Sequence, residues 1–134
     1  MFQRRKARPQ KRIDSLIGAG TVVQGNVTFS GGLRIDGSVN GKVATADDAQ
    51  GTLVISELAK ISGEVNVSHV VINGAVSGPV TATDYLELQA KARVNGDVVY
   101  RTLEMHVGAI VDGKLMHSEA GTASVVELKR ASGD

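Results

Sequence analysis

The sequence predicts an all-β fold: a single-domain parallel β-helix, a solenoid of about six coils with three short sides each. Two observations support this prediction. Two apolar residues bracket a glycine at two-residue intervals eight times in the 134 residues. The apolar pattern also returns at a mean step of roughly 18 residues, which fits three sides of about six residues. Because a repeat this short cannot bury its own apolar face, its neighbours must be stacked copies of itself.

The eight copies of the motif are built mainly on Val and Ile. They lie at Val23–Val27, Ile35–Val39, Val39–Val43, Ile61–Val65, Ile72–Val76, Val76–Val80, Val94–Val98 and Val111–Leu115. Apolar residues four positions apart also fit one face of a helix, but a central glycine costs a helix about 1 kcal/mol, and β-branched residues suit a strand. In a strand, the glycine is expected to point inward, where it allows a corner or a close approach of two sides.

The chain is expected to divide into three parts. Residues 1–12 form a basic tail, residues 13–117 form the β-helix, and residues 118–134 form a flexible C-terminal tail. Within the β-helix, polar stretches predict outer turns at residues 44–52, 56–60 and 81–85. Aromatic residues make up only 3% of the chain, which agrees with a thin interior of Val, Ile and Leu.

The basic tail differs in charge from the rest of the chain. Of the 15 basic residues, six lie among the first twelve with no acid, which leaves nine against 14 acidic residues in the remainder. Met1 and Phe2 form an apolar tip that can enter the headgroup region, while Arg4, Arg5 and Lys6 sit over anionic lipid. We therefore expect these five residues to target a membrane surface.

Two other interpretations of the tail remain open. Nucleic acid is the less favoured partner, because no aromatic side chain is interleaved among the bases to stack on nucleotides. A solvated tail without a partner is the other alternative.

The sequence contains no recognisable catalytic, nucleotide or metal motif. His69, His106 and His117 are scattered without the spacing of metal ligands, and the chain has no cysteine. The Gly-Lys pairs at residues 41–42 and 113–114 lack the other residues of a P-loop. We therefore predict no nucleotide, no cofactor, no metal site and no catalytic residue.

Two enzyme classes are weighed against this prediction. Stacked coils can bring two of Asp36, Asp97 and Asp112 together as a glycosidase carboxylate pair, but each lies beside a glycine, which favours a role in turns. A hexapeptide-repeat acyltransferase needs a strict six-residue register and a catalytic histidine at a subunit groove. The glycine steps of this chain are irregular, which argues against that class.

The ends of the predicted coil have no cap in the sequence. An uncapped β-helix exposes unpaired backbone groups and an open apolar cross-section, which monomeric solenoids cover with a polar cap or a helix. No amphipathic helix is predicted on either side of the coil. Uncapped ends are expected to stack on one another into a filament along the coil axis. A β-helix that binds a partner along a flat side without polymerising is the alternative.

Several segments, taken in order, resemble the bactofilins, a family of bacterial cytoskeletal proteins. They read IGAGTVVQGNV, GGLRIDGSVNGKV, ISGEV, INGAVSGPV, ARVNGDV and VGAIVDGKL. They cover roughly residues 13–117, and the short basic tail before them is part of the resemblance. The resemblance implies a right-handed coil that polymerises end to end, without a nucleotide, into nonpolar filaments. It also implies flexible termini, attachment to the cytoplasmic face of the inner membrane through an N-terminal segment, and scaffolding of cell-wall or morphogenetic enzymes.

The resemblance also implies where the polymer contact lies. It places an apolar residue of the last coil in that contact, which corresponds to Ile110 or Val111 here. The expected polymerisation interface takes in further apolar residues of both end coils and comprises Ile110, Val111, Leu115, Leu16, Ile17 and Val23.

Overall fold

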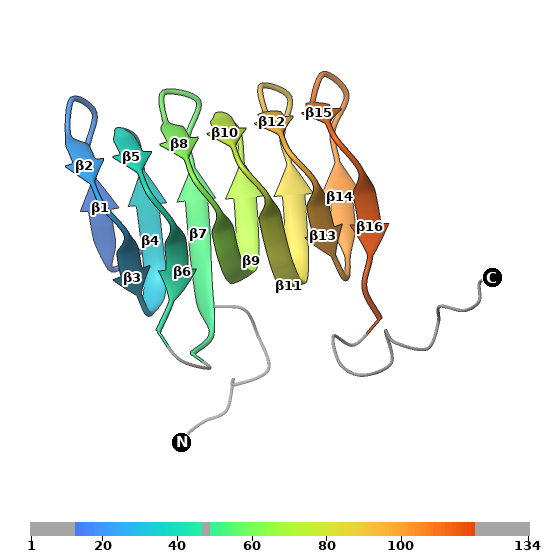
Figure 1. Ribbon diagram of the computed structural model, residues 1–134, viewed down its shortest axis with the longest axis horizontal. Coiled ribbons are helices and arrows are strands. Elements are labelled where there is room, and N and C mark those ends of the chain that lie inside the picture. Colours follow the sequence, from blue (N-terminus) through green and yellow to red (C-terminus); the bar gives the residue numbers. More distant parts are fainter. Residues whose placement is uncertain (1–12, 47–48, 120–134) are drawn as a thin grey trace.

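The short alternating runs of the sequence form short strands that wind into a coil. The computed structural model describes residues 13–46 and 49–119, in which sixteen strands and no helix occur. Every strand pairing among them is parallel. Figure 1 shows the coils advancing side by side from the N-terminal to the C-terminal end. The predicted parallel β-solenoid of about six coils is thereby confirmed.

Each coil has three sides, and each side is a stack of strands from successive coils. The first side contains β1 (Ser15–Ile17), β4 (Gly31–Ile35), β7 (Gly51–Ile55), β14 (Leu103–Met105) and the C-terminal parts of β9 (Val65–Ile72) and β11 (Val80–Leu88). The second side contains β2 (Val22–Gln24), β5 (Ser38–Asn40), β8 (Lys60–Ser62), β10 (Ala75–Ser77), β12 (Arg93–Asn95) and β15 (Ile110–Asp112). The third side contains β3 (Val27–Phe29), β6 (Val43–Thr45), β13 (Val98–Tyr100), β16 (Leu115–His117) and the N-terminal parts of β9 and β11.

Strands β9 and β11 each continue from the third side of one coil to the first side of the next. They join these two sides into one ten-stranded sheet, while the second side is a separate six-stranded sheet. The turn predicted at residues 81–85 is therefore wrong, because β11 stays extended there and only its register with β9 shifts, between Ala82 and Tyr85. The residues that flank Thr83 and Asp84 are paired with β9, Ala82 with Val67 and Tyr85 with His69, and this pairing holds the polar stretch extended. The turn predicted at residues 56–60 is confirmed, with the Ala59 N–H donating to the Ser56 carbonyl at 3.0 Å.

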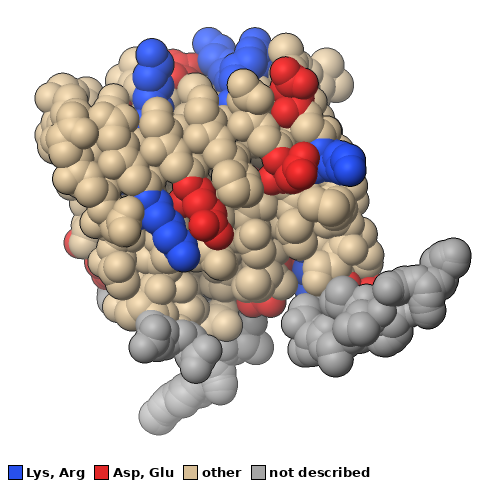
Figure 2. Space-filling view, viewed as in Figure 1, with Lys and Arg blue, Asp and Glu red and all other residues tan. Residues whose placement is uncertain are grey.

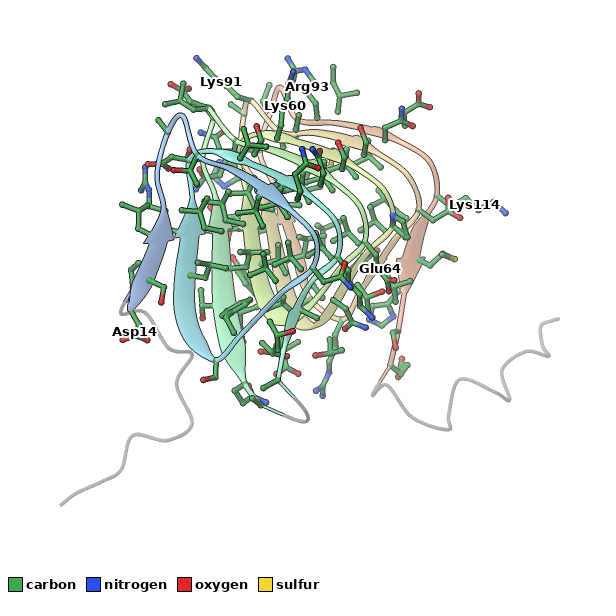
Figure 3. The ribbon with its side chains drawn as sticks, turned by 60° about the vertical axis from the view of Figure 1, so that its left-hand side comes forward. Asp14, Lys60, Glu64, Lys91, Arg93 and Lys114 are labelled. Carbon is green, nitrogen blue, oxygen red and sulfur yellow. The ribbon has the colours of Figure 1, made fainter. Side chains whose placement is uncertain are left out.

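The interior consists of stacked aliphatic side chains in register. In one stack, Leu53, Val70 and Leu86 follow one another from coil to coil, and all three are 0% exposed. Figure 3 shows side chains filling the space between the three sides, while Lys60, Lys91 and Arg93 project away from it. Each buried Val, Leu or Ile contributes about 1.5–3 kcal/mol, so the inner coils are held mainly by this interior.

A glycine occupies the corner between the second and third sides in every coil. These glycines are Gly25, Gly41, Gly63, Gly78, Gly96 and Gly113. The expectation that they point inward is wrong, because a Cβ on Gly63 would overlap the carbonyl oxygen of Gly41 in the preceding coil. The missing side chain therefore points along the coil axis, toward backbone. Gly63 also has a φ of 155°, which side-chain-bearing residues rarely adopt.

Side chains of Asn and Asp satisfy backbone N–H groups at the corners of the following coil. Asn26 Oδ1 accepts from the Lys42 N–H at 2.9 Å, and Asn73 Oδ1 accepts from the Lys91 N–H at 2.9 Å. These bonds link coils where the chain bends away from the strand ladder, so the corners keep their hydrogen bonds.

Candidate functional site

Both ends of the coil expose strand edges. Within the described residues, β1, β2 and β3 have no strand on their N-terminal side, and β14, β15 and β16 have none on their C-terminal side. Edge strands present unpaired N–H and C=O groups that can pair with another chain. The two coil ends are thus the places where this fold can be extended by a further copy.

The apolar interior is open at both ends. Inward-facing residues of the end coils are less covered than their inner counterparts: Ile17, Val23, Val27 and Phe29 in the first coil, and Leu103, Met105, Val111 and Leu115 in the last. Met105 is 44% exposed and Leu115 is 41% exposed, whereas Leu88 and Val98, their register partners one coil earlier, are 0% exposed. We call these two sets of four residues the N-terminal and C-terminal end layers.

The six residues of the predicted polymerisation interface fall into two groups. Ile17, Val23, Val111 and Leu115 belong to the end layers. Leu16 and Ile110 lie instead in outward-facing rows, in register with Arg34 and Arg93, and are 59% and 52% exposed. Contact of these six residues with another copy stays a prediction.

The predicted membrane-targeting residues, Met1, Phe2, Arg4, Arg5 and Lys6, lie outside the described residues. Within the described part, no helix is long and apolar enough to cross a bilayer. Figure 2 shows basic and acidic side chains interspersed on one face of the coil, with wide uncharged areas between them. In the sequence, six of the 15 basic residues lie among the first twelve residues.

The three candidate aspartates lie in three different coils. Asp36 lies in the second coil, whereas Asp97 and Asp112 lie in the fifth and sixth. Asp97 links two coils at a corner, because its Oδ1 accepts from the Lys114 N–H of the following coil at 3.1 Å. A hydrogen bond from Ser56 and the nearby Arg34 guanidinium hold the pKa of Asp36 below its ordinary value.

A cluster that sequence reasoning missed lies on the outer face of the first side. Glu87 in β11 and Glu104 in β14 are register neighbours, and His106 begins the corner after β14. His106 Nε2 lies 3.1 Å from Glu87 Oε2 and 3.4 Å from Glu104 Oε2. The spacing of the histidines did not indicate this cluster, but Glu87 and Glu104 are 17 residues apart, which is close to the length of one coil. Their stacking could have been found from the repeat.

Two uncharged side chains hold the carboxylates of this cluster. The Tyr85 hydroxyl donates to Glu104 Oε1 at 2.7 Å, and Gln89 Nε2 donates to Glu87 Oε2 at 3.1 Å. The hydrogen bond to Glu104, together with burial and the charges of Glu87 and Glu104, raises the pKa of Tyr85 well above its ordinary value. Tyr85 is therefore held in its neutral, donating form.

A hollow on the third side is lined by no comparable cluster of charged side chains. It has a volume of about 430 Å³ and is lined mainly by small, hydroxyl and amide side chains, with Lys42 as its charged residue. The other two histidines have local partners: His69 Nδ1 lies 3.1 Å from Ser68 Oγ, and the His117 ring lies 5.6 Å from the Tyr100 ring.

Comparison with known proteins identifies the family of this chain. The family model described as "Bactofilin: Polymer-forming cytoskeletal" matches residues 15–116, which include all but the last residue of the sixteen strands. The chain belongs to the bactofilin family. Bactofilins form polymers and are a structural rather than an enzymatic family, which places this chain among polymer-forming cytoskeletal proteins.

Two curated bactofilins of Myxococcus xanthus (strain DK1622) are similar to this chain. Bactofilin BacO is 26% identical over 102 residues, which cover 76% of this chain and 78% of BacO. Bactofilin BacP is 25% identical over 85 residues, which cover 63% of this chain but only 34% of BacP. No solved structure matches the chain significantly.

Proposed function

We propose that this bactofilin assembles end to end through its two end layers into nucleotide-independent, nonpolar filaments at the cytoplasmic face of the inner membrane. There it organises cell-shape or cell-wall factors along the filament. The observation that supports this proposal is the pair of open apolar end layers, each framed by three strand edges.

Apolar burial and backbone pairing favour the two coil ends over the flat sides as the assembly contact. A further copy stacked on the C-terminal end layer would cover side chains such as Met105 and Leu115, which their own chain leaves 44% and 41% exposed. It would also pair the edges of β14, β15 and β16, and each hydrogen bond gained there contributes about 0.5–1.5 kcal/mol. Both effects need no nucleotide, because the energy comes from burial and backbone pairing alone.

A charge placed in the C-terminal end layer tests this contact. We expect Val111→Arg to abolish filaments in sedimentation assays while circular dichroism still shows a folded β-protein, because a buried, unpaired charge is costly. Leu115→Arg provides a second variant at a more exposed position. The matched control is Ser77→Arg, which adds the same charge to the exposed face of β10 in the middle of the coil.

The size of the remaining particle reports filament polarity. If like ends meet, as in a nonpolar filament, Val111→Arg leaves dimers joined through their N-terminal end layers, and Val23→Arg leaves dimers joined through the other end.

Filaments that persist in both Val111→Arg and Leu115→Arg would contradict the proposed contact. A wild-type chain that stays monomeric at high concentration would favour the binding-module alternative.

The membrane part of the proposal is supported by the charge of the N-terminal tail. Each basic residue near an anionic surface contributes about 1 kcal/mol, and Met1 and Phe2 supply an apolar tip. A filament repeats this weak anchor many times, so a modest affinity per copy becomes firm attachment through avidity. The proposed recruitment of cell-wall or morphogenetic enzymes is supported by the family resemblance. A filament would also present the same partner-binding surface many times along its length.

Vesicle binding tests the anchor directly. We expect full-length protein to sediment with vesicles containing anionic phosphatidylglycerol. Arg4→Glu with Arg5→Glu should weaken this binding by about 30-fold or more, because at least 2 kcal/mol is lost. The charge-matched control, Lys129→Glu with Arg130→Glu, should bind normally. Equal loss in the control, or binding to DNA but not to vesicles, would contradict a membrane anchor in the tail.

A further inference from the structure

The cluster of Glu87, Glu104 and His106 has the arrangement of a three-ligand metal site. One ligand atom from each residue lies within 4.8 Å of the others. The residues come from adjacent coils: Glu87 from β11 in the fifth coil, Glu104 from β14 in the sixth, and His106 from the corner that follows. All three side chains are open to solvent to some degree, which leaves an ion a path of entry.

The distances fit a tetrahedral ion. Zinc binds histidine nitrogen and carboxylate oxygen at about 2.0–2.2 Å, so two ligand atoms of a tetrahedral site lie roughly 3.3–3.5 Å apart. His106 Nε2 lies 3.1 Å and 3.4 Å from the nearest oxygens of Glu87 and Glu104. The ligand oxygens of Glu87 and Glu104 lie within 4.8 Å of one another, so a side-chain shift that narrows this third separation places one ion between the three atoms.

Charge also favours a cation at this position. Like charges on directly opposite residues of neighbouring strands are destabilising, and Glu87 and Glu104 are such a pair. Among the described residues, neither carboxylate has an ion pair with Lys or Arg, and His106 is their basic neighbour. A neutral imidazole leaves two negative charges uncompensated, whereas a divalent cation compensates both.

Two further side chains orient the carboxylates. The Tyr85 hydroxyl holds Glu104 Oε1 at 2.7 Å, which leaves Oε2 on the side of His106. Gln89 Nε2 holds Glu87 Oε2 at 3.1 Å. Outer hydrogen bonds of this kind fix the ligands of metal sites, and their loss typically costs 10–100-fold in metal affinity.

We propose that Glu87, Glu104 and His106 bind a zinc-class divalent cation that ties the last coil to the fifth. One imidazole and two carboxylates suit Zn²⁺ or Co²⁺, whereas Ca²⁺ takes six to eight oxygen ligands. Three protein ligands leave at least one position for water. The site lies on the outer face of the first side, so it does not require the end-to-end contact proposed above.

Titration of full-length protein with Co²⁺ and Zn²⁺ tests this proposal. We expect one Co²⁺ per chain, with the visible absorption of a low-coordinate cobalt centre, and displacement of the cobalt by Zn²⁺. Glu87→Gln, Glu104→Gln and His106→Gln should each weaken binding at least tenfold, and Tyr85→Phe should weaken it less. By the general order of divalent affinities, Mn²⁺ should bind more weakly than Co²⁺.

Two control variants separate this site from general surface binding. Glu64→Gln removes an exposed carboxylate elsewhere on the coil, and His117→Gln removes a histidine of the third side, where its ring lies against Tyr100. Both should keep wild-type Co²⁺ affinity and absorption. The proposal is overturned if wild-type protein shows no saturable site, or if the controls lose binding as much as the cluster variants. In either case His106 serves only as an ion-pair partner of the two glutamates.

Discussion

The corner glycines show how single residues set the spacing of the coils. At Gly63 and the equivalent glycines of every coil after the first, the backbone of one coil passes so close to the preceding carbonyl that no side chain fits between them. Strand ladders place neighbouring backbones about 4.7–4.9 Å apart, and a Cβ directed along the coil axis would have to fit within that gap. A glycine ladder is therefore a requirement of stacking.

Replacement of one corner glycine tests this requirement. We expect Gly63→Ala to destabilise the protein by about 2–4 kcal/mol, because the new Cβ overlaps the Gly41 carbonyl and the φ of 155° is strained for alanine. Urea denaturation gives the value. Gly18→Ala is the matched control, because a Cβ there meets nothing within 4 Å and its φ is ordinary. Equal stability of the two variants would show that the ladder is not a steric constraint.

Residue patterns predicted the interior well and the corners less well. Ile35, Val39 and Val65 belong to the glycine motif that was expected to face the interior, and they are fully buried. Alternation describes one strand, however, and the glycine constraint arises between backbones of successive coils. The direction of the missing Cβ could therefore not be read from the local pattern.

At the scale of elements, β11 and β14 are joined on their outer face by side chains as well as by their ladder. The Tyr85 hydroxyl crosses from β11 to Glu104 in β14 at 2.7 Å, and its pKa is raised mainly by that hydrogen bond. A raised folded pKa means that the folded state holds the phenol proton more tightly than the unfolded chain does. The contact therefore stabilises the fold below about pH 10, the ordinary tyrosine value, and this stability is lost as the pH rises through the folded pKa.

Tyrosine absorption tests this contact between strands. The chain has two tyrosines, so Tyr100→Phe leaves Tyr85 as the single reporter. We expect its phenolate to appear well above pH 10 in folded protein, and Glu104→Gln should move the titration down toward pH 10. Ionisation of Tyr85 near pH 10 with Glu104 intact would contradict the hydrogen bond as the cause.

Two features of β11 and β14 could not be predicted from the sequence pattern within one strand. Strands were predicted from apolar residues that bracket a glycine at two-residue intervals. Residues 81–85 did not form the predicted turn, because the paired segments of β11 on either side hold this polar stretch extended. The cluster at Glu87, Glu104 and His106 was missed for a related reason. Metal-ligand spacings within one helix or loop do not apply to a solenoid, where neighbours in space are one coil apart.

At the scale of the whole molecule, the coil has a covered middle and two open ends. Val98 in the fifth coil is 0% exposed, while Leu115, one step along the same stack, is 41% exposed. A longer coil of the same kind would still end in such a layer, so only a cap or another copy can cover it. No cap was predicted from the sequence, and none is present in residues 13–46 and 49–119. Membership of a polymer-forming family agrees with the second solution.

Electron microscopy of purified full-length protein, negatively stained without nucleotide and with a chelator, tests end-to-end assembly most directly. The account predicts long, smooth filaments whose width matches one coil and whose axis is the coil axis. The same preparation of Val111→Arg should show only small particles, with Ser77→Arg indistinguishable from wild type. Small, uniform particles from the wild-type chain under these conditions would show that the end layers are covered, and would contradict assembly through them.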